Sequence, residues 1–354
     1  MRSRCRFAAL AVASVVAVLA ACSSSDDGSS AIESTPTPAT IVTEAETGTD
    51  TVADTETGAF AGTSVITMPG PIDATSIAVA GDGDVWVGTA KQVWHLVDDE
   101  SVQYDLLGVI DLEIAPDGVV WAAAYSPAAL QKGEWVRYTS STGPFNDLTV
   151  GADGTVWACD RFGVHRLNGD VWELVDEAIP LTIGANSFSC KVEAGSDGTV
   201  WVGAWVGFGP SVGFLTRFDG SSWQEIRLPA GRSPGVYAMA LAPNGDLWTV
   251  FIDDGPDNRF VSTLGRFDGE TWTVFDEAAG MPPIVVDSLA IDQEGVVWLI
   301  HFTDVDDSTD IGGLIAFDGE DWTSLLDGHT ASDVAVSPDG TVWVAGDQLF
   351  SIER

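Results

Sequence analysis

Apolar and polar residues alternate in short runs along most of the chain, and each alternating run is followed by one that is almost wholly apolar. The alternating pairs include Ile77 with Val79 and Val334 with Val336. Alternation at a period of two residues predicts a half-buried strand. The segment Val85-Trp86-Val87 has no polar face, which predicts a strand covered on both sides. The pattern therefore predicts a series of paired β-strands.

A short polar step, usually Asp-Gly, separates the two runs of each pair. Asp-Gly or Asn-Gly between apolar runs is a hairpin signal, because Gly accepts the positive φ that the turn needs. In every copy a Trp follows the Gly by three residues, as in Asp339-Gly340-Thr341-Val342-Trp343. The repeat tryptophans are Trp86, Trp121, Trp157, Trp201, Trp248, Trp298 and Trp343.

The spacing of these tryptophans predicts the architecture. Successive copies lie 35, 36, 44, 47, 50 and 45 residues apart. Repeats of roughly 40–50 residues with about four strands each are typical of a β-propeller. A second marker, Phe-Asp-Gly followed by Trp, begins at Phe218, Phe267 and Phe317 and predicts the hairpin between the third and fourth strands. We therefore expect an all-β, seven-bladed propeller of four-stranded antiparallel blades over residues 61–354.

The last repeat supplies only three strands before Arg354. The segment Ser64–Pro69 resembles fourth strands elsewhere, such as Glu225–Pro229. We expect this N-terminal strand to join the last blade and close the ring, which would leave no open sheet edge.

The repeats resemble those of bacterial seven-bladed propellers of the two-component-regulator and streptogramin (virginiamycin B) lyase-like families. The resemblance covers roughly residues 61–354. Lyases of that type use loop histidines and a metal-bound carboxylate at the channel mouth to eliminate across a lactone. The resemblance would make His301 a general base, with Asp304 or Asp333 on the metal. However, the family's histidines occupy matching places in adjacent repeats, and His301 and His329 do not.

Residues 1–21 have the pattern of a signal peptide. Three arginines among the first six residues precede the apolar run Phe7–Ala21, which is too short for a confident membrane span. The run ends in Leu19-Ala20-Ala21-Cys22, which resembles the lipobox of bacterial lipoproteins. That resemblance implies cleavage before Cys22, lipidation of its thiol and anchoring on the extracytoplasmic face of the cell membrane. The alternative is ordinary secretion with Cys22 incidental.

Residues 22–60 are rich in Ser, Thr, Ala, Gly and acidic residues and contain no Lys or Arg. Such a composition buries too little apolar surface to order itself. We expect a disordered acidic tether between the anchor and the propeller. A wall-spanning or glycosylated stalk is the alternative.

The charge of the chain narrows the class of partner. It contains 15 Lys and Arg against 53 Asp and Glu, and removing the signal peptide with its three arginines takes the formal net charge from −38 to −41. This disfavours nucleic acid and anionic lipid as partners. A cationic ligand, cations or simple solubility are all compatible with it. We expect a monomer that binds an extracellular ligand or protein, with no assigned cofactor beyond Ca²⁺ or Mg²⁺ as candidate cations.

Two cysteines lie in the predicted propeller. Cys159 ends a second strand, and Cys190 begins the innermost strand of the next blade. These two strand ends fall on one face of the ring, so a disulfide is expected in an oxidising compartment. Two buried free thiols are the alternative, and two thiols alone make a poor zinc site.

Two groups of residues are candidate ligand sites. The first comprises the long second-to-third-strand connections of units 4, 5 and 6, because long loops on a rigid scaffold commonly carry binding. Their candidate ligand-binding residues are Trp205, Phe208, Asp253, Asp254 and Asn258. Asp304 and Asp306 are candidates for holding Ca²⁺ through carboxylate oxygens. Neutral loop growth and solvated acidic loops are the alternatives.

The second group surrounds the channel mouth. Six residues before each turn's Asp, Asn or Glu, at the start of each innermost strand, stand Ser76, Asp111, Asp147, Lys191, Ala238, Ser288 and Asp333. Asp111, Asp147 and Asp333 could bind a ligand there, or the polar residues could cap the strand starts by local hydrogen bonds.

The leading hypothesis is a lipid-anchored extracytoplasmic propeller that binds a ligand or partner protein without catalysis. The alternative is a metal-assisted lyase or hydrolase that uses His301 and His329.

Overall fold

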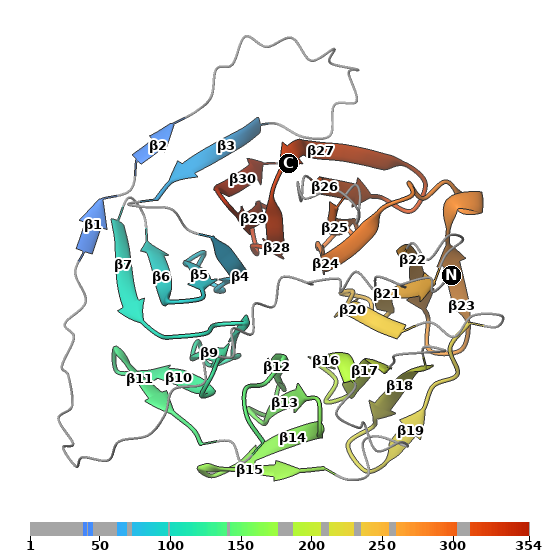
Figure 1. Cartoon of the computed structure of the whole chain (residues 1–354), viewed down its shortest axis with the longest axis horizontal. Helices are drawn as coiled ribbons and strands as arrows, with labels where there is room; N and C mark the ends of the chain where they lie inside the picture. The colour runs from blue at the N-terminus through green and yellow to red at the C-terminus, as the bar shows by residue number, and fades with distance from the viewer. Residues whose placement is uncertain are drawn as a thin grey trace, which may run out of the picture. The chain divides into compact units, whose positions relative to one another are not determined.

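Seven antiparallel sheets stand around a common axis (Figure 1). The structure is a computed structural model that describes residues 38–40, 42–44, 62–68, 73–97, 100–139, 142–175, 187–206, 212–229, 235–254, 260–302 and 312–353. These residues belong to one compact unit, Pro36–Arg354. The predicted all-β, seven-bladed propeller is confirmed. Nowhere in these ranges is there a helix with the length and apolarity that a membrane crossing needs.

Each blade begins with its innermost strand, as the alternating and then wholly apolar runs predicted. Blade 1 has β4 (Ala74–Val79), β5 (Val85–Thr89), β6 (Gln92–Val97) and β7 (Glu100–Asp105). Blade 2 has β8 (Asp111–Ile114), β9 (Val120–Ala123), β10 (Ala128–Gln131) and β11 (Glu134–Arg137). Blade 3 has β12 (Asp147–Val150), β13 (Val156–Asp160), β14 (Gly163–Asn168) and β15 (Val171–Leu174).

The later blades contain longer strands. Blade 4 has β16 (Ser187–Ala194), β17 (Val200–Val206), β18 (Val212–Phe218) and β19 (Trp223–Glu225). Blade 5 has β20 (Gly235–Leu241), β21 (Leu247–Asp254), β22 (Phe260–Phe267) and β23 (Trp272–Phe275), followed by the 3-10 helix η2 (Glu277–Ala279). Blade 6 has β24 (Val285–Ile291), β25 (Val297–Phe302), β26 (Gly312–Phe317) and β27 (Trp322–His329). Blade 7 has β28 (Ala331–Val336), β29 (Val342–Gly346) and β30 (Leu349–Glu353).

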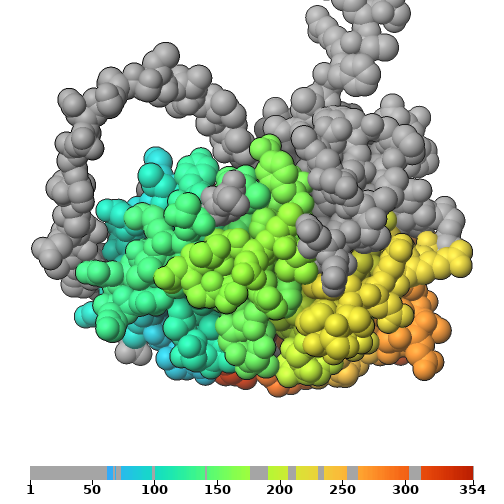
Figure 2. Space-filling model, turned by 90° about the horizontal axis from the view of Figure 1, so that it is seen from below, coloured from blue at the N-terminus to red at the C-terminus, as the bar shows by residue number. Residues whose placement is uncertain are grey.

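The ring closes as the sequence predicted. Strand β3 (Gly62–Thr67) pairs antiparallel with β30, and supplies the fourth strand of blade 7. The blades follow one another in chain order around the rim, as the colours from blue-green to orange in Figure 2 show.

Two short strands lie within the segment expected to be an unstructured tether. Strand β1 (Pro38–Thr40) pairs with β7, and β2 (Val42–Glu44) pairs with β3. The outermost strands β7 and β3 present backbone groups that an added strand can pair with. The expectation of disorder over residues 22–60 therefore differs from the structure at these two strands.

The repeat turn has the geometry that its Gly predicts. Gly340 has φ of 92°, and its N–H donates to the carbonyl of Ser337. The side chain of Asp339 accepts from the N–H of Thr341 at 3.0 Å, which completes the turn. These local bonds explain why an acidic residue precedes Gly in most repeats.

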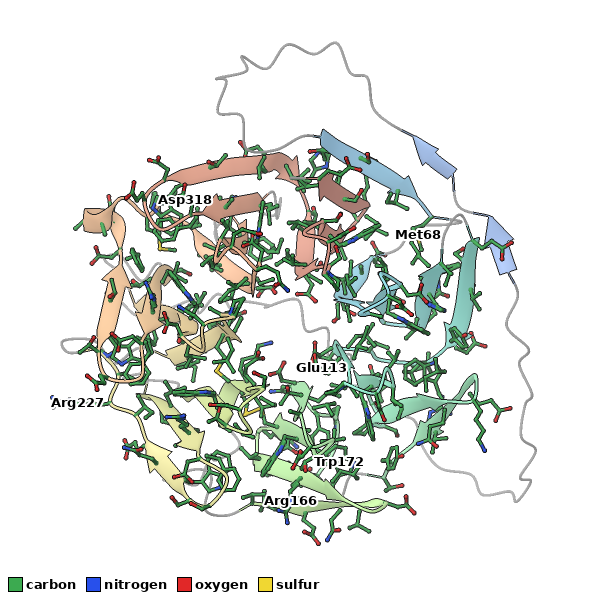
Figure 3. All side chains as sticks on the ribbon, turned by 180° about the vertical axis from the view of Figure 1, so that it is seen from behind. Met68, Glu113, Arg166, Trp172, Arg227 and Asp318 are labelled. Atoms are coloured by element: carbon green, nitrogen blue, oxygen red, sulfur yellow. A yellow bond between two sulfur atoms is a disulfide. The ribbon has the colours of Figure 1, made fainter. Side chains whose placement is uncertain are left out.

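The repeat tryptophans pack between neighbouring blades. Trp298 of blade 6 is fully buried in a cluster with Val334 and Val344 of blade 7. A comparable apolar cluster fills each of the other six seams between blades. The core of this protein is therefore a ring of interfaces, and the axis is left for polar residues. Figure 3 shows Glu113 close to that axis, whereas Arg166 and Asp318 lie toward the rim.

A disulfide joins Cys159 of β13 to Cys190 of β16, with 6.0 Å between their Cα atoms. It links blades 3 and 4 beside their innermost strands. Both residues are buried in the apolar cluster between these blades.

Candidate functional site

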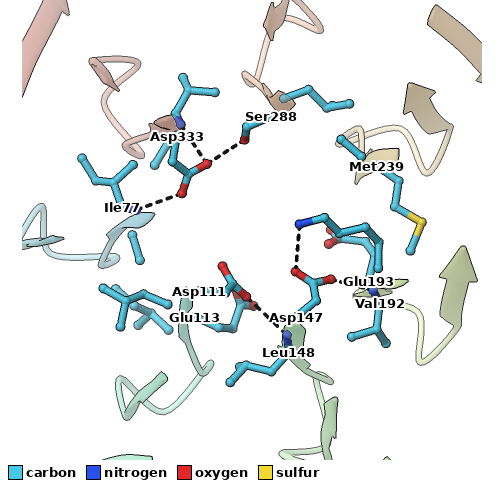
Figure 4. Close-up of a pocket in the computed structure, with 18 of the residues that line it drawn as sticks. Ile77, Asp111, Glu113, Asp147, Leu148, Val192, Glu193, Met239, Ser288 and Asp333 are labelled. Atoms are coloured by element: carbon cyan, nitrogen blue, oxygen red, sulfur yellow. Dashed lines mark hydrogen bonds and ion pairs between the residues drawn. The ribbon is translucent and has the colours of Figure 1, made fainter. Parts of the chain in front are cut away.

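A cavity of about 300 Å³ lies on the axis of the ring, lined by the innermost strands of all seven blades (Figure 4). Seven charged side chains line it: Asp111, Glu113, Asp147, Lys191, Glu193, Asp287 and Asp333. Met239 and several leucines supply apolar wall between them. The volume is within the range of small-ligand sites, and its walls carry six carboxylates against one ammonium.

The three aspartates predicted at the channel mouth join neighbouring blades. Asp333 of blade 7 accepts from the N–H of Ile77 in blade 1 at 2.9 Å. Asp111 of blade 2 accepts from the N–H of Leu148 in blade 3 at 3.3 Å. The sequence had suggested local capping bonds as the alternative to ligand binding. Asp333 also accepts from the N–H of its neighbour Val334 at 2.9 Å, so one local bond is present, but the other two backbone bonds cross the seams.

Asp147 makes the same kind of bond between blades 3 and 4. It accepts from the N–H of Val192 at 2.7 Å. Ser76 takes this role between blades 1 and 2, accepting from the N–H of Leu112 at 3.0 Å. One residue position in the repeat thus supplies an acceptor to the backbone of the following blade.

A second tier lies two residues deeper in the same strands, on the same face because strand side chains repeat every two residues. Glu113 accepts from the N–H of Val150, and Glu193 accepts from the N–H of Leu241. Thr149 accepts from the N–H of Ala194 at 3.2 Å.

The two seams that flank blade 6 use side-chain pairs instead. Ser288 donates to Asp333 at 2.6 Å, and Tyr237 donates to Asp287 at 3.0 Å. Tyr237 and Asp287 each lie at a shift of strand register. A β-bulge at such a shift changes the direction of a side chain. With these two pairs, every seam of the ring has a polar contact close to the axis.

Burial and mutual repulsion shift the titration of these carboxyls upward. Burial raises the pKa of Asp111 well above its ordinary value, and Asp147 and Asp333 add to the rise. Burial raises the pKa of Glu113 in the same way, with Glu193 adding to it. Burial, helped by Asp147, raises the pKa of Glu193 to about 8. Burial and mutual repulsion therefore both oppose full ionisation of these carboxyls.

Lys191 is the basic residue among the described residues that line this cavity. Its Nζ lies 3.3 Å from Oδ1 of Asp147. Burial alone would lower the pKa of its ammonium, but the attraction of Asp147 and Asp111 outweighs burial and raises that pKa. Lys191 therefore stays charged across the physiological range.

Four of the polar residues near the axis are not among the site residues that the sequence predicts: Glu113, Glu193, Tyr237 and Asp287. The two glutamates had a usable signal, because four other blades have Ala at the equivalent position: Ala78, Ala240, Ala290 and Ala335. A carboxylate at a repeat position where other blades have Ala indicates a polar site near the axis. Tyr237 and Asp287 had no such signal, because the register shift that turns them toward the axis is not encoded in the repeat spacing.

The two histidines of the enzyme hypothesis lie on opposite faces of blade 6. His301 in β25 follows Leu299 on the face that packs on blade 5, since side chains alternate along the strand. His329 in β27 contacts the ring of Phe350 in blade 7, with 4.9 Å between centroids. Strand β26 separates the two. They therefore do not form one metal site.

His301 is 3% exposed, and neither of its ring nitrogens has a hydrogen-bond partner among the residues that the structure describes. Burial lowers its pKa, so it is neutral at physiological pH. Within the described ranges, no group of three or more His, Cys, Asp or Glu side chains is placed to hold a metal ion.

The predicted loop site is only partly within the described residues. The sequence predicts these loops over Ala204–Gly213, Ile252–Thr263 and His301–Gly313. They are shorter than that, because β17, β21 and β25 extend into them and pair as far as Val206, Asp254 and Phe302. Trp205 lies on β17 and packs against the backbone of Gly235 in blade 5, where an added Cβ would come within 2.1 Å of the indole.

The other loop candidates stay predictions. Asp253 and Asp254 belong to strand β21, but their side chains lie outside the described part of the structure. Phe208, Asn258, Asp304, Asp306 and the lipidation candidate Cys22 lie outside the described residues altogether.

The fold is shared with several solved structures. Virginiamycin B lyase from Staphylococcus aureus superposes with a TM-score of 0.63 at 17% identity, covering 80% of this chain and 95% of the lyase. The extracellular domain assigned to a hybrid two-component system of B. thetaiotaomicron gives 0.60 at 13% identity, covering 81% of this chain and 39% of that one. YCF48 bound to D1 peptide gives 0.57 at 14% identity, covering 82% and 97%.

These identities establish the propeller fold and nothing finer. The expected resemblance to the lyase and two-component propellers is confirmed at that level. The chain matches no protein-family model and no curated protein.

Proposed function

We propose that the chain is a non-catalytic, extracytoplasmic binding propeller that takes a small organic cation in its axial cavity. The observation that carries this proposal is the excess of carboxylates over cations in one axial cavity. Six carboxylates and one ammonium line a cavity of about 300 Å³. A cleft lined by one sign of charge concentrates ligands of the opposite sign.

The raised pKa values support the same proposal. Burial raises the pKa of Asp111, Glu113 and Glu193, which means that their ionised forms lack sufficient compensation. A bound cation would supply that compensation and favour ionisation of all three.

An organic ammonium fits the lining better than a bare metal ion. The described side chains offer no cluster with metal-ligand placement. The cavity combines carboxylates with apolar wall from Met239 and Leu289, which suits an ammonium carried on a short hydrocarbon.

Binding without catalysis is favoured by the placement of the polar groups. His301 and His329 lie on opposite faces of blade 6, and the mouth aspartates are already engaged with backbone N–H groups. The cavity is a set of fixed acceptors rather than a nucleophile with a base.

The extracytoplasmic, lipid-anchored location is part of the proposal. It is supported by the signal-like residues 1–21, by the lipobox-like sequence ending at Cys22, and by the Cys159–Cys190 disulfide. Disulfides persist in oxidising compartments.

The test is calorimetric titration of the full chain with 1,4-diaminobutane at low salt. We expect saturable binding at one site, weakening as salt rises because the attraction is screened. Asp287→Asn removes one cavity charge but keeps an acceptor for Tyr237, and should weaken binding about tenfold, which is about 1.4 kcal/mol.

The matched control is Asp170→Asn, which removes the same charge from an exposed turn at the rim. It should leave the affinity unchanged. No saturable heat with the unmodified chain, or an equal loss in both variants, would overturn the proposal.

A further inference from the structure

The ammonium of Lys191 lies among carboxylates from several blades. Lys191 comes from β16 of blade 4, at the repeat position occupied elsewhere by Ser, Asp or Ala. Its side chain keeps 34% of its surface exposed, and the cavity is the space that this surface lines. Within the part of the chain that the structure describes, its Nζ donates to Oδ1 of Asp147 at 3.3 Å.

Four aspartates act on this ammonium, in the order Asp147, Asp111, Asp333 and Asp287. They come from blades 3, 2, 7 and 6, and all four line the same cavity as Lys191. A primary ammonium is therefore already held in the acidic ring, attached to the chain by a flexible four-carbon stem.

The seam between blades 3 and 4 does not depend on Lys191. Asp147 accepts from the N–H of Val192 at 2.7 Å, and Thr149 accepts from the N–H of Ala194. The Cys159–Cys190 disulfide crosses the same seam. The ammonium therefore adds a charge to the cavity rather than a connection between blades.

We propose that Lys191 is a tethered competitor that occupies the ammonium site of the axial cavity, so that a soluble organic ammonium binds by displacing it. This inference rests on the proposed function and adds its regulation and ligand class, a primary ammonium. A ligand that must displace an internal group binds more weakly. Its apparent affinity is reduced in proportion to the fraction of time that the site is free. The stem of Lys191 has the rotational freedom to swing aside, because its ammonium has one directional partner.

The proposal predicts chemical complementation. Lys191→Ala removes the stem beyond Cβ together with the ammonium, and n-propylammonium has the same three carbons and the same charge. This amine should therefore bind the variant where Lys191 lay. Lys191→Met keeps the stem volume and removes the charge, so it frees the carboxylates without leaving space for the propyl chain.

The experiment titrates n-propylammonium into the full chain and into both variants by calorimetry. We expect Lys191→Ala to bind it at least about tenfold more tightly than the unmodified chain. Lys191→Met should gain less than Lys191→Ala. The amine should also raise the thermal midpoint of Lys191→Ala more than that of the unmodified chain, because it binds only the folded form.

Equal or weaker binding by Lys191→Ala overturns the inference. If Lys191→Ala does not fold, the comparison moves to 1,4-diaminobutane on Lys191→Met, whose affinity must exceed that of the unmodified chain. Binding of 1,4-diaminobutane by the unmodified chain decides the proposed function separately. A cavity that binds amines only after Lys191 is replaced would support the competitor and overturn the proposed function. If the unmodified chain binds amines and replacing Lys191 brings no gain in affinity, the proposed function is supported and the competitor inference is overturned.

Discussion

The carboxylate of Asp333 in the last blade accepts a hydrogen bond of 2.9 Å from the backbone N–H of Ile77 in the first blade, 256 residues earlier in the chain. Its other oxygen accepts from Ser288 in blade 6. One side chain thus connects three blades at the axis, at the point where the ring closes.

Asp333→Ala should lower the free energy of unfolding by about 2–3 kcal/mol, because it leaves the N–H of Ile77 without its charged acceptor. Asp333→Asn keeps one acceptor and should cost less. Chemical denaturation followed by tryptophan fluorescence measures both. Asp170→Ala is the control and should stay within about 0.5 kcal/mol. A midpoint for Asp333→Ala equal to that of the control would rule out this role.

Stability should depend on pH through Glu193. Its pKa is raised from 4.5 to about 8 in the folded protein, so the folded state binds more protons than the unfolded state between these values. The contribution of Glu193 to stability therefore falls as pH rises from about 4.5 to about 8.

Glu193→Gln should remove that dependence. The variant should gain stability relative to the unmodified chain between about pH 5 and about pH 9, measured by denaturation midpoints across the range. Parallel curves for the two proteins would contradict an ionisation of Glu193 in this window.

Reducing the Cys159–Cys190 bond should lower the free energy of unfolding by about 3–4 kcal/mol in the chain-entropy description. The two cysteines are 31 residues apart. Cys159→Ser with Cys190→Ser should reproduce the effect of the reductant, and the reductant should then have no further effect. Thiol titration of the denatured chain, with and without reduction, checks the bond directly.

Trp298→Ala should cost about 3–5 kcal/mol, because its fully buried indole fills the seam between blades 6 and 7. Its Nε1 also donates to Asp292 at 3.1 Å. Trp343→Ala should cost less, since that indole is only partly buried. Denaturation midpoints compare the two variants. An equal or reversed order would show that burial does not set the contribution of a repeat Trp to stability.

Cys22→Ala should move the protein from the membrane fraction to the soluble or secreted fraction, because a single signal peptide without acyl chains leaves no stable anchor. Ser23→Ala is the matched control and should stay with the membrane. Incorporation of labelled fatty acid, present in the control and lost in Cys22→Ala, reads the modification itself. Retention of Cys22→Ala in the membrane fraction would remove the lipidation prediction.

The sequence predicted the fold well because its information is local and repeated. A turn such as Asp339-Gly340 and a Trp three residues later recur in every unit. The turn specifies a hairpin and the Trp fills the interface with the next blade, and neither depends on distant parts of the chain. The closing strand Gly62–Thr67 could be anticipated because blade 7 lacked one strand.

The candidate site was predicted less completely. Asp111, Asp147 and Asp333 were placed at the axis by counting back from each turn, and the structure puts them there. Their partners were missed, because a backbone N–H in the next blade cannot be identified from one repeat. His301 and His329, the pair of the enzyme hypothesis, lie on opposite sides of blade 6, because side chains alternate along a strand.

The amino-acid sequence by itself determined the strands and turns of each blade, its interface tryptophan and the number of blades, because these depend on residues within a few positions of one another. Tertiary structure alone decided that Asp287 reaches the axis through a register shift and that Lys191 lies among aspartates of four blades. The physical reason is that charges act through space: once the ring closes, groups far apart in the chain line one cavity, where burial strengthens their interactions.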